Sequence, residues 1–318
     1  MKWTKQRLNN LFFILGIVAI VVMLLTFDVS FVELWEHICH AGYWLIPIVG
    51  IWIVVYAMNA LAWKATIEGN IGGKMPVSFW RLYRLTITGY ALNYATPVGG
   101  LGGEPYRIME LSKDIDQEHA TSSVILYAMM HFFAHFWFWF ISIFIYLALA
   151  IIGDLPFTLT IGITLGIMSK IPGLKKWTLR FWARHPETIE NIDKQIVALK
   201  EQDKGAFYKS LFWEYFSRVT QSLEVMFMLL LFGVDCGGGL GGLTLTFLHS
   251  ILIVSFTTLF ANLIGFLPMQ LGVQEGGFVL SIAALGLSAA LGIFVSIICR
   301  VREIIWIAIG MLLMKIKE

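Results

Sequence analysis

The stretch at residues 97–104, PVGGLGGE, lies among long apolar segments, yet it holds one proline, four glycines and a carboxylate. Such a composition interrupts a membrane helix, because glycine and proline both disfavour a helix interior. A second copy, PMQLGVQE at residues 268–275, again places a glutamate seven positions after a proline. An asparagine precedes each proline, Asn93 in the first copy and Asn262 in the second. Paired interruptions in two halves of an apolar chain indicate a transporter binding site.

The composition is that of a membrane protein. Of the 318 residues, 58% are hydrophobic and 14% are charged, and the mean hydropathy is +0.76. Soluble domains carry about 25% charged residues. Long apolar runs predict helices, because a helix satisfies its own backbone hydrogen bonds in lipid. No nucleic-acid partner is expected.

We expect an all-α polytopic membrane protein with about six transmembrane helices and two re-entrant helical hairpins in an inverted repeat. The first hairpin is expected at about residues 77–118 and the second at about residues 243–287. If residues 243–266 cross the membrane fully, the orientation of the C-terminus changes. The predicted spans are residues 8–27, 42–63, 121–152, 157–168 with their flanks, 211–234 and 288–314.

The distribution of basic residues predicts the orientation. Lys and Arg lie before the first expected span and after the second, and none lies in residues 28–41 between them. By the positive-inside rule the N-terminus is cytoplasmic, and counting spans places both termini there, in a bacterial inner membrane. The expected organisation is a first membrane repeat at residues 1–169, a cytoplasmic amphipathic linker at 170–209 and a second membrane repeat at 210–318.

The first hairpin is predicted to offer an anion site. Pro105 suits the first turn of a helix, so a half-helix is expected to begin near Glu104 with its N-terminus inside the membrane. Free N–H groups and the helix dipole attract anions there, and Arg107 adds a full positive charge. Glu104 either caps this helix or pairs with an arginine, or it binds a cationic group or carries a proton. The same alternatives apply to Glu275.

Charged side chains in the predicted spans need partners. Arg300, Arg302 and Glu303 interrupt the apolar last span, and an arginine at a helix centre costs about 2.5–3.5 kcal/mol on insertion scales. Arg300 either faces a central cavity or pairs with Glu303 on the same helix face. Glu214 and Arg218, four positions apart, are expected to form an ion pair near the membrane interface.

Histidines and cysteines give weaker signals. His131 and His135 share a helix face, but no clear third ligand accompanies them, so neither a metal nor a cofactor is expected. Cys39 and Cys236 fall in expected outer loops, where they either form a disulfide or stay unpaired. We find no serine or cysteine nucleophile with a partnered base, so the chain is not expected to be an enzyme.

Residues 97–104 followed by Arg107, together with LGVQEG at residues 271–276, resemble the paired signatures of the flippase-like membrane domain family. This family includes the membrane domain of bacterial lysylphosphatidylglycerol synthase/flippases, YbhN-like membrane proteins and archaeal glycosylation-associated membrane proteins. The resemblance covers nearly the whole chain, and Arg300 matches an arginine in the family's last span. It implies movement of a lipid, with a phosphate headgroup, between leaflets.

The chain departs from the family pattern at several positions. Met269 and Gln270 stand where glycines are usual, and Gln274 replaces a typical arginine. In the long span after the first hairpin, Tyr127 and His131 lie in the region where the family has a Glu-Arg pair. These differences bear on which side chains contact the headgroup.

We therefore predict a lipid flippase or transporter for a phospholipid or a polyprenyl-phosphate-linked lipid, with an anionic headgroup held at the midplane by the two hairpins. The alternatives are a membrane enzyme acting on a lipid-linked substrate and a non-transporting scaffold for a lipid-modifying enzyme. Besides the lipid, a membrane enzyme and a second copy of the chain are candidate partners. The residues expected to bind the headgroup are Asn93, Pro97, Gly99, Gly100, Gly102, Gly103, Glu104, Arg107, Asn262, Pro268, Gly272, Glu275, Arg300 and Glu303.

Overall fold

The fold is all-helical in a computed structural model that describes residues 41–95, 102–152, 203–234, 236–263 and 272–316. These residues form eight α-helices and one short 3-10 helix, and no β-strand occurs among them. The expected all-α class is confirmed. Some predicted features lie outside the described residues, namely the spans at residues 8–27 and 157–168, most of the expected linker, and the site candidates Pro97, Gly99, Gly100 and Pro268.

Three of the described helices are long and apolar enough to cross a membrane. They are α3 (Leu45–Ile71), which follows the 3-10 helix η1 (Gly42–Trp44), α6 (Gln117–Ile151) and α10 (Gly239–Leu263). At 1.5 Å per residue they are about 37–53 Å long, which exceeds the hydrocarbon thickness of about 30 Å. α3 and α6 cover most of the predicted spans at residues 42–63 and 121–152. α10 was expected to be one arm of a re-entrant hairpin, and it is also long enough for a full crossing.

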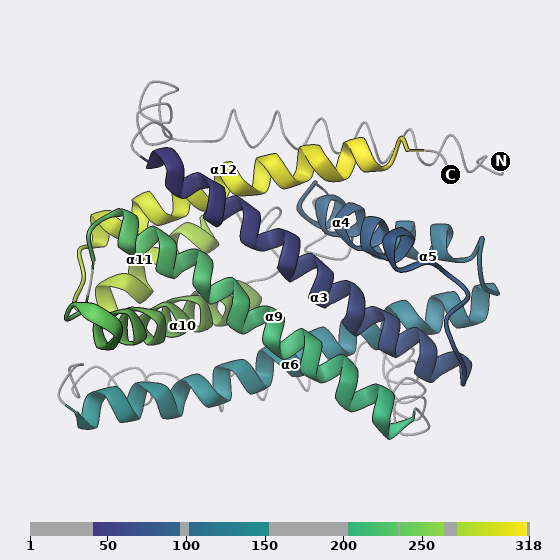
Figure 1. Cartoon of the computed structure of the whole chain (residues 1–318), viewed down its shortest axis with the longest axis horizontal. Coiled ribbons are helices and arrows are strands. Elements are labelled where there is room, and N and C mark those ends of the chain that lie inside the picture. The colour runs from purple at the N-terminus through teal and green to yellow at the C-terminus, as the bar shows by residue number, and fades with distance from the viewer. Residues whose placement is uncertain (1–40, 96–101, 153–202, 235, 264–271, 317–318) are drawn as a thin grey trace, which may run out of the picture.

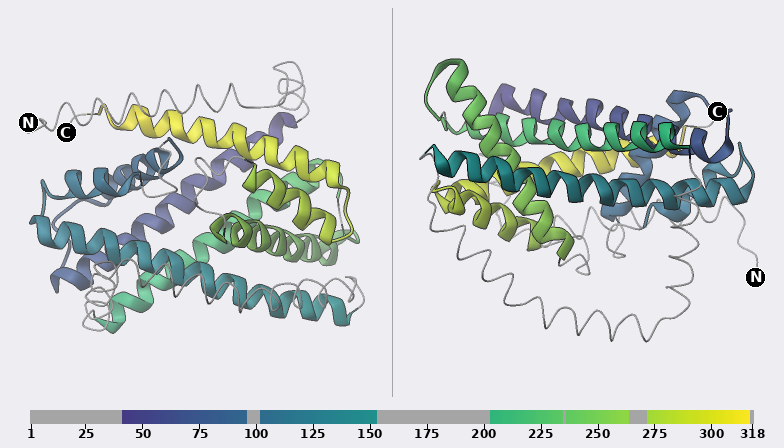
Figure 2. Two further views of the ribbon diagram at one scale, coloured as in Figure 1. Left: turned by 180° about the vertical axis from the view of Figure 1, so that it is seen from behind. Right: turned by 90° about the horizontal axis from the view of Figure 1, so that it is seen from below.

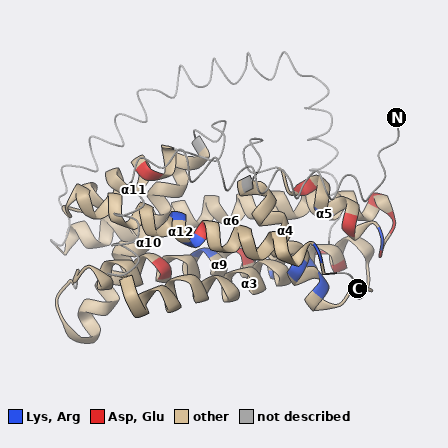
Figure 3. Ribbon diagram, turned by 90° about the horizontal axis from the view of Figure 1, so that it is seen from above, with Lys and Arg blue, Asp and Glu red and all other residues tan. Residues whose placement is uncertain are grey.

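Two further long helices carry charged residues in their middle. α9 (Lys204–Leu231) and α12 (Ala289–Leu313) contribute six buried charged side chains, Glu214, Arg218, Glu224, Arg300, Arg302 and Glu303. Figure 3 shows charged residues in the middle of the bundle around these helices, and more of them at the end that carries the C-terminus. Buried charges of this kind need partners inside the protein. α9 begins at Lys204, so the last residues of the expected linker belong to this helix.

α3 and α9 run antiparallel and side by side through the bundle (Figure 1). Hydrogen bonds hold this register at two points: Trp52 Nε1 donates to Glu224 at 2.8 Å, and the hydroxyl oxygens of Thr66 and Ser210 lie 3.0 Å apart. α6 packs on both helices of this pair, whereas α12 packs mainly on α4 (Phe79–Ala95) and on α11 (Val273–Ala284). The last helix therefore connects the two halves of the bundle.

Two helical hairpins lie toward opposite ends of the bundle (Figures 1 and 2). α4 and α5 (Glu104–Leu111) lie toward the end that carries the C-terminus, and α10 and α11 lie toward the other end. Helix α12 contacts both hairpins. A rearrangement of either hairpin would therefore change the contacts of α12.

A glycine lets the arms of each hairpin approach closely. A Cβ at Gly103, which directly precedes α5, would collide with the backbone of Gly89 of α4. In the second hairpin, a Cβ at Gly277 of α11 would lie 3.0 Å from the methyl group of Thr257 of α10. Small residues at such contacts are typical of packed membrane helices, and here they fix the positions of the residues that follow them.

Candidate functional site

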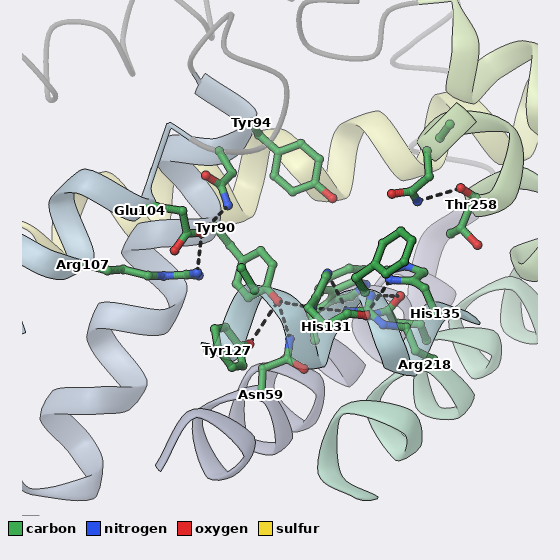
Figure 4. A pocket seen from close by; sticks show the side chains of 17 residues that line it. Asn59, Tyr90, Tyr94, Glu104, Arg107, Tyr127, His131, His135, Arg218 and Thr258 are labelled. Carbon is green, nitrogen blue, oxygen red and sulfur yellow. Dashed lines mark hydrogen bonds and ion pairs between the residues drawn. The ribbon is translucent and has the colours of Figure 1, made fainter. Parts of the chain in front are cut away.

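A cavity of about 350 Å³ lies where α4, α5 and α10 approach α3, α6 and α9. Figure 4 shows Tyr90 between the Glu104–Arg107 pair on one side and the His131–Arg218 pair on the other. The volume is in the range of small-molecule sites, about 300–1,000 Å³. The lining combines aromatic rings, amides and charged groups from Trp52, Asn59, Tyr90, Asn93, Tyr94, Glu104, Arg107, Tyr127, Ala128, His131, Phe132, His135, Arg218, Gln221, Thr258, Ala261 and Asn262.

The first hairpin places three predicted site residues on the cavity. Asn93 Oδ1 accepts a hydrogen bond of 2.6 Å from the N–H of Gly103, and Asn93 Nδ2 donates to Glu104 Oε1 at 3.4 Å. Arg107 Nη1 donates to the same oxygen at 2.9 Å. Helix α5 begins at Glu104, as expected, and the carboxylate pairs with an arginine, which is one of the alternatives left open by the sequence.

Arg107 is held on all sides. Its side chain is 2% exposed, and its guanidinium carbon lies 4.8 Å from the ring centroid of Tyr90 and 5.6 Å from those of Trp63 and Tyr127. A Cβ at Gly89 would collide with this guanidinium. Desolvated cation–π contacts contribute about 2 kcal/mol or more. The hairpin thus presents Arg107 in one fixed orientation, with its charge neutralised by Glu104.

The opposite wall holds a second charged cluster, on α6 and α9. Glu214 is fully buried, and its Oε2 atom lies 2.9 Å from His131 Nδ1 and 3.2 Å from Arg218 Nη2. The same Nη2 atom is 2.6 Å from Nδ1 and 2.7 Å from Nε2 of His131. The expected Glu214–Arg218 pair is present, but both side chains are buried and a histidine joins them, which the sequence did not predict.

The Tyr90 hydroxyl connects the two walls. Asn59 Nδ2 donates to it at 3.2 Å, and it lies 3.3 Å from the Tyr127 hydroxyl and 3.3 Å from His131 Nδ1. Its ring also lies beneath the guanidinium of Arg107. A displacement of the first hairpin would therefore move a group that is bonded to His131.

The second hairpin reaches the cavity with the end of α10. Asn262 lines the cavity and donates to the Thr258 carbonyl of its own helix at 2.8 Å. Gly272 precedes α11 with φ +78°, a conformation that other residues rarely adopt. Asn262 is therefore held by its own helix, unlike Asn93, which joins two helices.

Glu275, Arg300 and Glu303 lie in a network apart from the cavity lining. Arg300 Nη2 is 2.7 Å from Glu275 Oε1, and Arg300 Nη1 is 2.8 Å from Glu303 Oε2. Gln274 Nε2 donates to Glu303 Oε1 at 3.0 Å. Arg300 thus forms the intrahelical pair that the sequence offered as one alternative, and it also binds the second hairpin.

Arg302 extends this network to α9 and α3. Its Nε atom is 2.8 Å from Glu224 Oε1, and its guanidinium lies 4.0 Å from the ring centroid of Trp52. Trp52 donates to the other oxygen of Glu224 and also lines the cavity. These three side chains therefore connect the ion pairs of the second hairpin with the cavity wall.

The structure brings some predicted site residues together and separates others. Asn93, Glu104, Arg107 and Asn262 line one cavity, and Gly102 and Gly103 are buried beside Glu104. Sequence reasoning missed the cavity residues Asn59, Tyr90 and Gln221. Asn59 and Gln221 are amides inside largely apolar helices, a signal that could have identified them.

The histidine and cysteine signals have other local explanations. His135 Nδ1 lies 3.1 Å from the His131 carbonyl oxygen, and both imidazoles line the cavity. Within the described ranges, no three His, Cys, Asp or Glu side chains gather as a metal site requires. Cys236 Sγ lies 3.1 Å from His249 Nδ1, and Cys39 falls outside the described residues.

Long apolar helices around an internal charged cavity define this chain as a helical membrane protein. The sequence model of the lysylphosphatidylglycerol synthase TM region matches residues 13–310, so the chain belongs to that family and the resemblance seen in the sequence is confirmed. It is a membrane protein linked to lipid metabolism or transport. Comparisons with curated proteins and with solved structures give no match.

Proposed function

We propose that the chain moves a lipid with an anionic, phosphate-bearing headgroup between membrane leaflets. The observation that carries this proposal is the cavity itself, which is built from both hairpins and contains two arginines. The substrate is a phospholipid or a polyprenyl-phosphate-linked lipid, and its chains stay in the bilayer while the headgroup enters the cavity.

A charged group is costly in hydrocarbon, so a headgroup needs a polar path through the protein. Buried arginines within membrane helices mark substrate pathways, because each is expensive unless it serves a partner or a cavity. Arg107 and Arg218 both line the cavity, and each keeps one buried Nε atom without a hydrogen-bond partner among the described residues. A phosphate would accept from guanidinium groups through charge-assisted bonds.

The carboxylates have a matching role in the proposal. Glu104 neutralises Arg107 and Glu214 neutralises Arg218 when no headgroup is present. An arriving phosphate would compete with each carboxylate, so binding would loosen the contact that holds α5 and the contact that holds α9. Arg300 and Glu303 would act indirectly, by holding Glu275 and so the second hairpin.

We further propose an inverted-repeat arrangement in a bacterial inner membrane, with both hairpins re-entrant and both termini cytoplasmic. The positions of the hairpins toward opposite ends of the bundle support it. So do four basic residues: Lys64 in the last two turns of α3, Lys74 just after α3, Arg81 in the first turn of α4 and Lys113 just after α5. We propose no catalytic role for any residue. In this proposal, a partner enzyme carries out any chemical modification of the lipid.

The test is lipid movement in vesicles reconstituted with purified protein. Fluorescent phosphatidylglycerol in the outer leaflet is quenched by dithionite, and a protein that moves lipid raises the quenched fraction above the half seen in protein-free vesicles. We expect movement by the wild type and strong loss in Arg218→Gln, with Lys64→Gln as a control for an exposed charge. Quenching of wild-type vesicles at the protein-free level would refute the proposal and favour the enzyme or scaffold alternatives.

A further inference from the structure

His131 lies between a carboxylate and a guanidinium. The Nη2 atom of Arg218 is 2.6 Å from Nδ1 and 2.7 Å from Nε2 of His131, and His131 Nδ1 is also 2.9 Å from Glu214 Oε2. The guanidinium is a fixed positive charge with donors and no acceptor, so the neutral imidazole fits beside it better than the imidazolium does.

We infer that His131, Glu214 and Arg218 form a proton-binding site that couples headgroup binding in the cavity to protonation. The inference rests on the proposed function and adds to it a source of energy or regulation. One proton from the cavity binds the unprotonated ring nitrogen of His131, and no covalent bond other than this N–H forms. The imidazolium then keeps its hydrogen bond to Glu214.

Protonation changes the position that Arg218 can hold. The imidazolium has two donors and no acceptor, so its contacts of 2.6 and 2.7 Å with Arg218 Nη2 become contacts between donors that both carry positive charge. Glu214 Oε2, which is 3.2 Å from Arg218 Nη2, is then shared by two cations. Gln221 Oε1 lies 3.4 Å from Arg218 Nη1, and Gln221 lines the cavity. Repulsion between the two cations therefore turns the guanidinium toward the cavity, where a phosphate can take the place of the shared carboxylate.

The exposure of His131 to the cavity suits a proton-binding role. The His131 side chain is 27% exposed and lines the cavity, whereas Glu214 behind it is 0% exposed, so a proton arriving from the cavity meets His131 first. An unperturbed imidazole takes up a proton between about pH 5 and 8, so this is the range in which binding is first measured.

Other titratable and charged groups face His131 from the helices packed around it. Tyr90 comes from α4, Glu104 and Arg107 from α5, Tyr127 and His135 from α6, and Glu214 and Arg218 from α9, while α3 and α10 contribute the uncharged Asn59 and Thr258. Arg107 is already paired with Glu104. Arg218 is therefore the cation whose contacts change most when His131 is charged.

The experiment measures binding of short-chain phosphatidylglycerol to purified protein in detergent across about pH 5 to 8. This lipid keeps a single phosphodiester charge over that range, so a change in affinity reports on the protein. We expect wild-type affinity to fall by up to about tenfold per pH unit above the midpoint of His131 titration. His131→Gln, whose amide takes up no proton, is expected to bind with little dependence on pH.

His119→Gln is the matched control, because His119 lies on the same helix, is 43% exposed and pairs with Asp116 outside the cavity. This variant is expected to keep the wild-type pH profile.

The outcomes separate this inference from the proposed function. A flat wild-type profile overturns the inference even if His131→Gln fails to fold, and so does a wild-type profile retained by His131→Gln. If the wild type moves lipid in vesicles at a rate that does not change with pH, the proposed function stands and the proton site falls. If the wild type binds phosphatidylglycerol no better than diacylglycerol and moves no lipid at any pH, both fall.

Discussion

The Arg300 guanidinium of α12 lies 2.7 Å from the Glu275 carboxylate at the start of α11, so one charged contact ties the last helix to the second hairpin. The same guanidinium binds Glu303 at 2.8 Å on its own helix. Arg300 is 2% exposed and Glu303 is 0% exposed. Glu275 is therefore paired with this one buried arginine, whereas Glu303 is also 3.8 Å from Arg302 Nη1.

Arg300→Ala is expected to destabilise the protein strongly, because it leaves Glu275 and the buried Glu303 without their common partner. Breaking a buried ion pair from one side costs about 3–5 kcal/mol. Glu275→Gln should cost less, since Arg300 keeps Glu303. Unfolding in mixed detergent micelles measures both values, and the double variant gives the coupling energy.

Lys64→Ala is the control for this series. Lys64 and Glu68 form an exposed pair at 3.9 Å on α3, and such pairs contribute about 0–1 kcal/mol. If Arg300→Ala lowers the free energy of unfolding no more than Lys64→Ala does, the contact with Glu275 does not hold the hairpin.

Asn93 and Asn262 each precede the proline of one sequence copy by a few residues, yet the structure predicts different effects for them. Asn93→Ala removes the acceptor for the Gly103 N–H and the link to Glu104, and a buried donor left unpaired costs about 1–3 kcal/mol. Asn262→Ala removes a bond within one helix on an exposed residue, and surface changes are usually within about 0.5 kcal/mol. Thermal unfolding of the two variants in one detergent tests the difference, and equal losses would contradict it.

The sequence was sufficient for those parts of the site that depend on local chemistry. Pro105 suits the first turn of a helix and so predicted a helix start near Glu104, and α5 begins there. Spacing of three residues placed Arg300 and Glu303 on one helix face, and they pair. Such predictions succeed because helix geometry fixes which residues of one helix are neighbours.

Contacts between different helices could not be predicted from the spacing of residues in the sequence. Nothing in the spacing of α9 and α12 indicates that Glu224 faces Arg302, or that the ring of Trp52 lies against both. The same holds for His131, which meets Glu214 and Arg218 from another helix. A charged residue in an apolar helix shows that a partner is needed, but only the packing of the bundle shows which partner it has.

Gly103→Ala is expected to separate α5 from α4, because the new methyl group would collide with the Gly89 backbone, which cannot move aside as a flexible side chain could. Overpacking costs about 1–3 kcal/mol, and the displaced Arg107 should reduce lipid movement as well. Gly276→Ala is the control, since a Cβ there meets nothing within 4 Å. The measurements are the free energy of unfolding and the vesicle assay. Equal behaviour of the two variants would show that the close approach of α4 and α5 is not required.

The Trp52 side chain makes two interactions, and two different substitutions measure their contributions to stability separately. Trp52→Phe keeps a ring over Arg302 but loses the 2.8 Å hydrogen bond to Glu224, and hydrogen bonds to charged groups contribute about 1.5–3 kcal/mol. Trp52→Leu also loses the cation–π contact, a further loss of about 0.5–2 kcal/mol. Trp80, which is 71% exposed, serves as the control, and its substitution by Phe or Leu should leave the free energy of unfolding nearly unchanged. If Trp52→Phe and Trp52→Leu destabilise the protein equally, the ring adds nothing at Arg302, and the hydrogen bond to Glu224 alone joins α3 to the network.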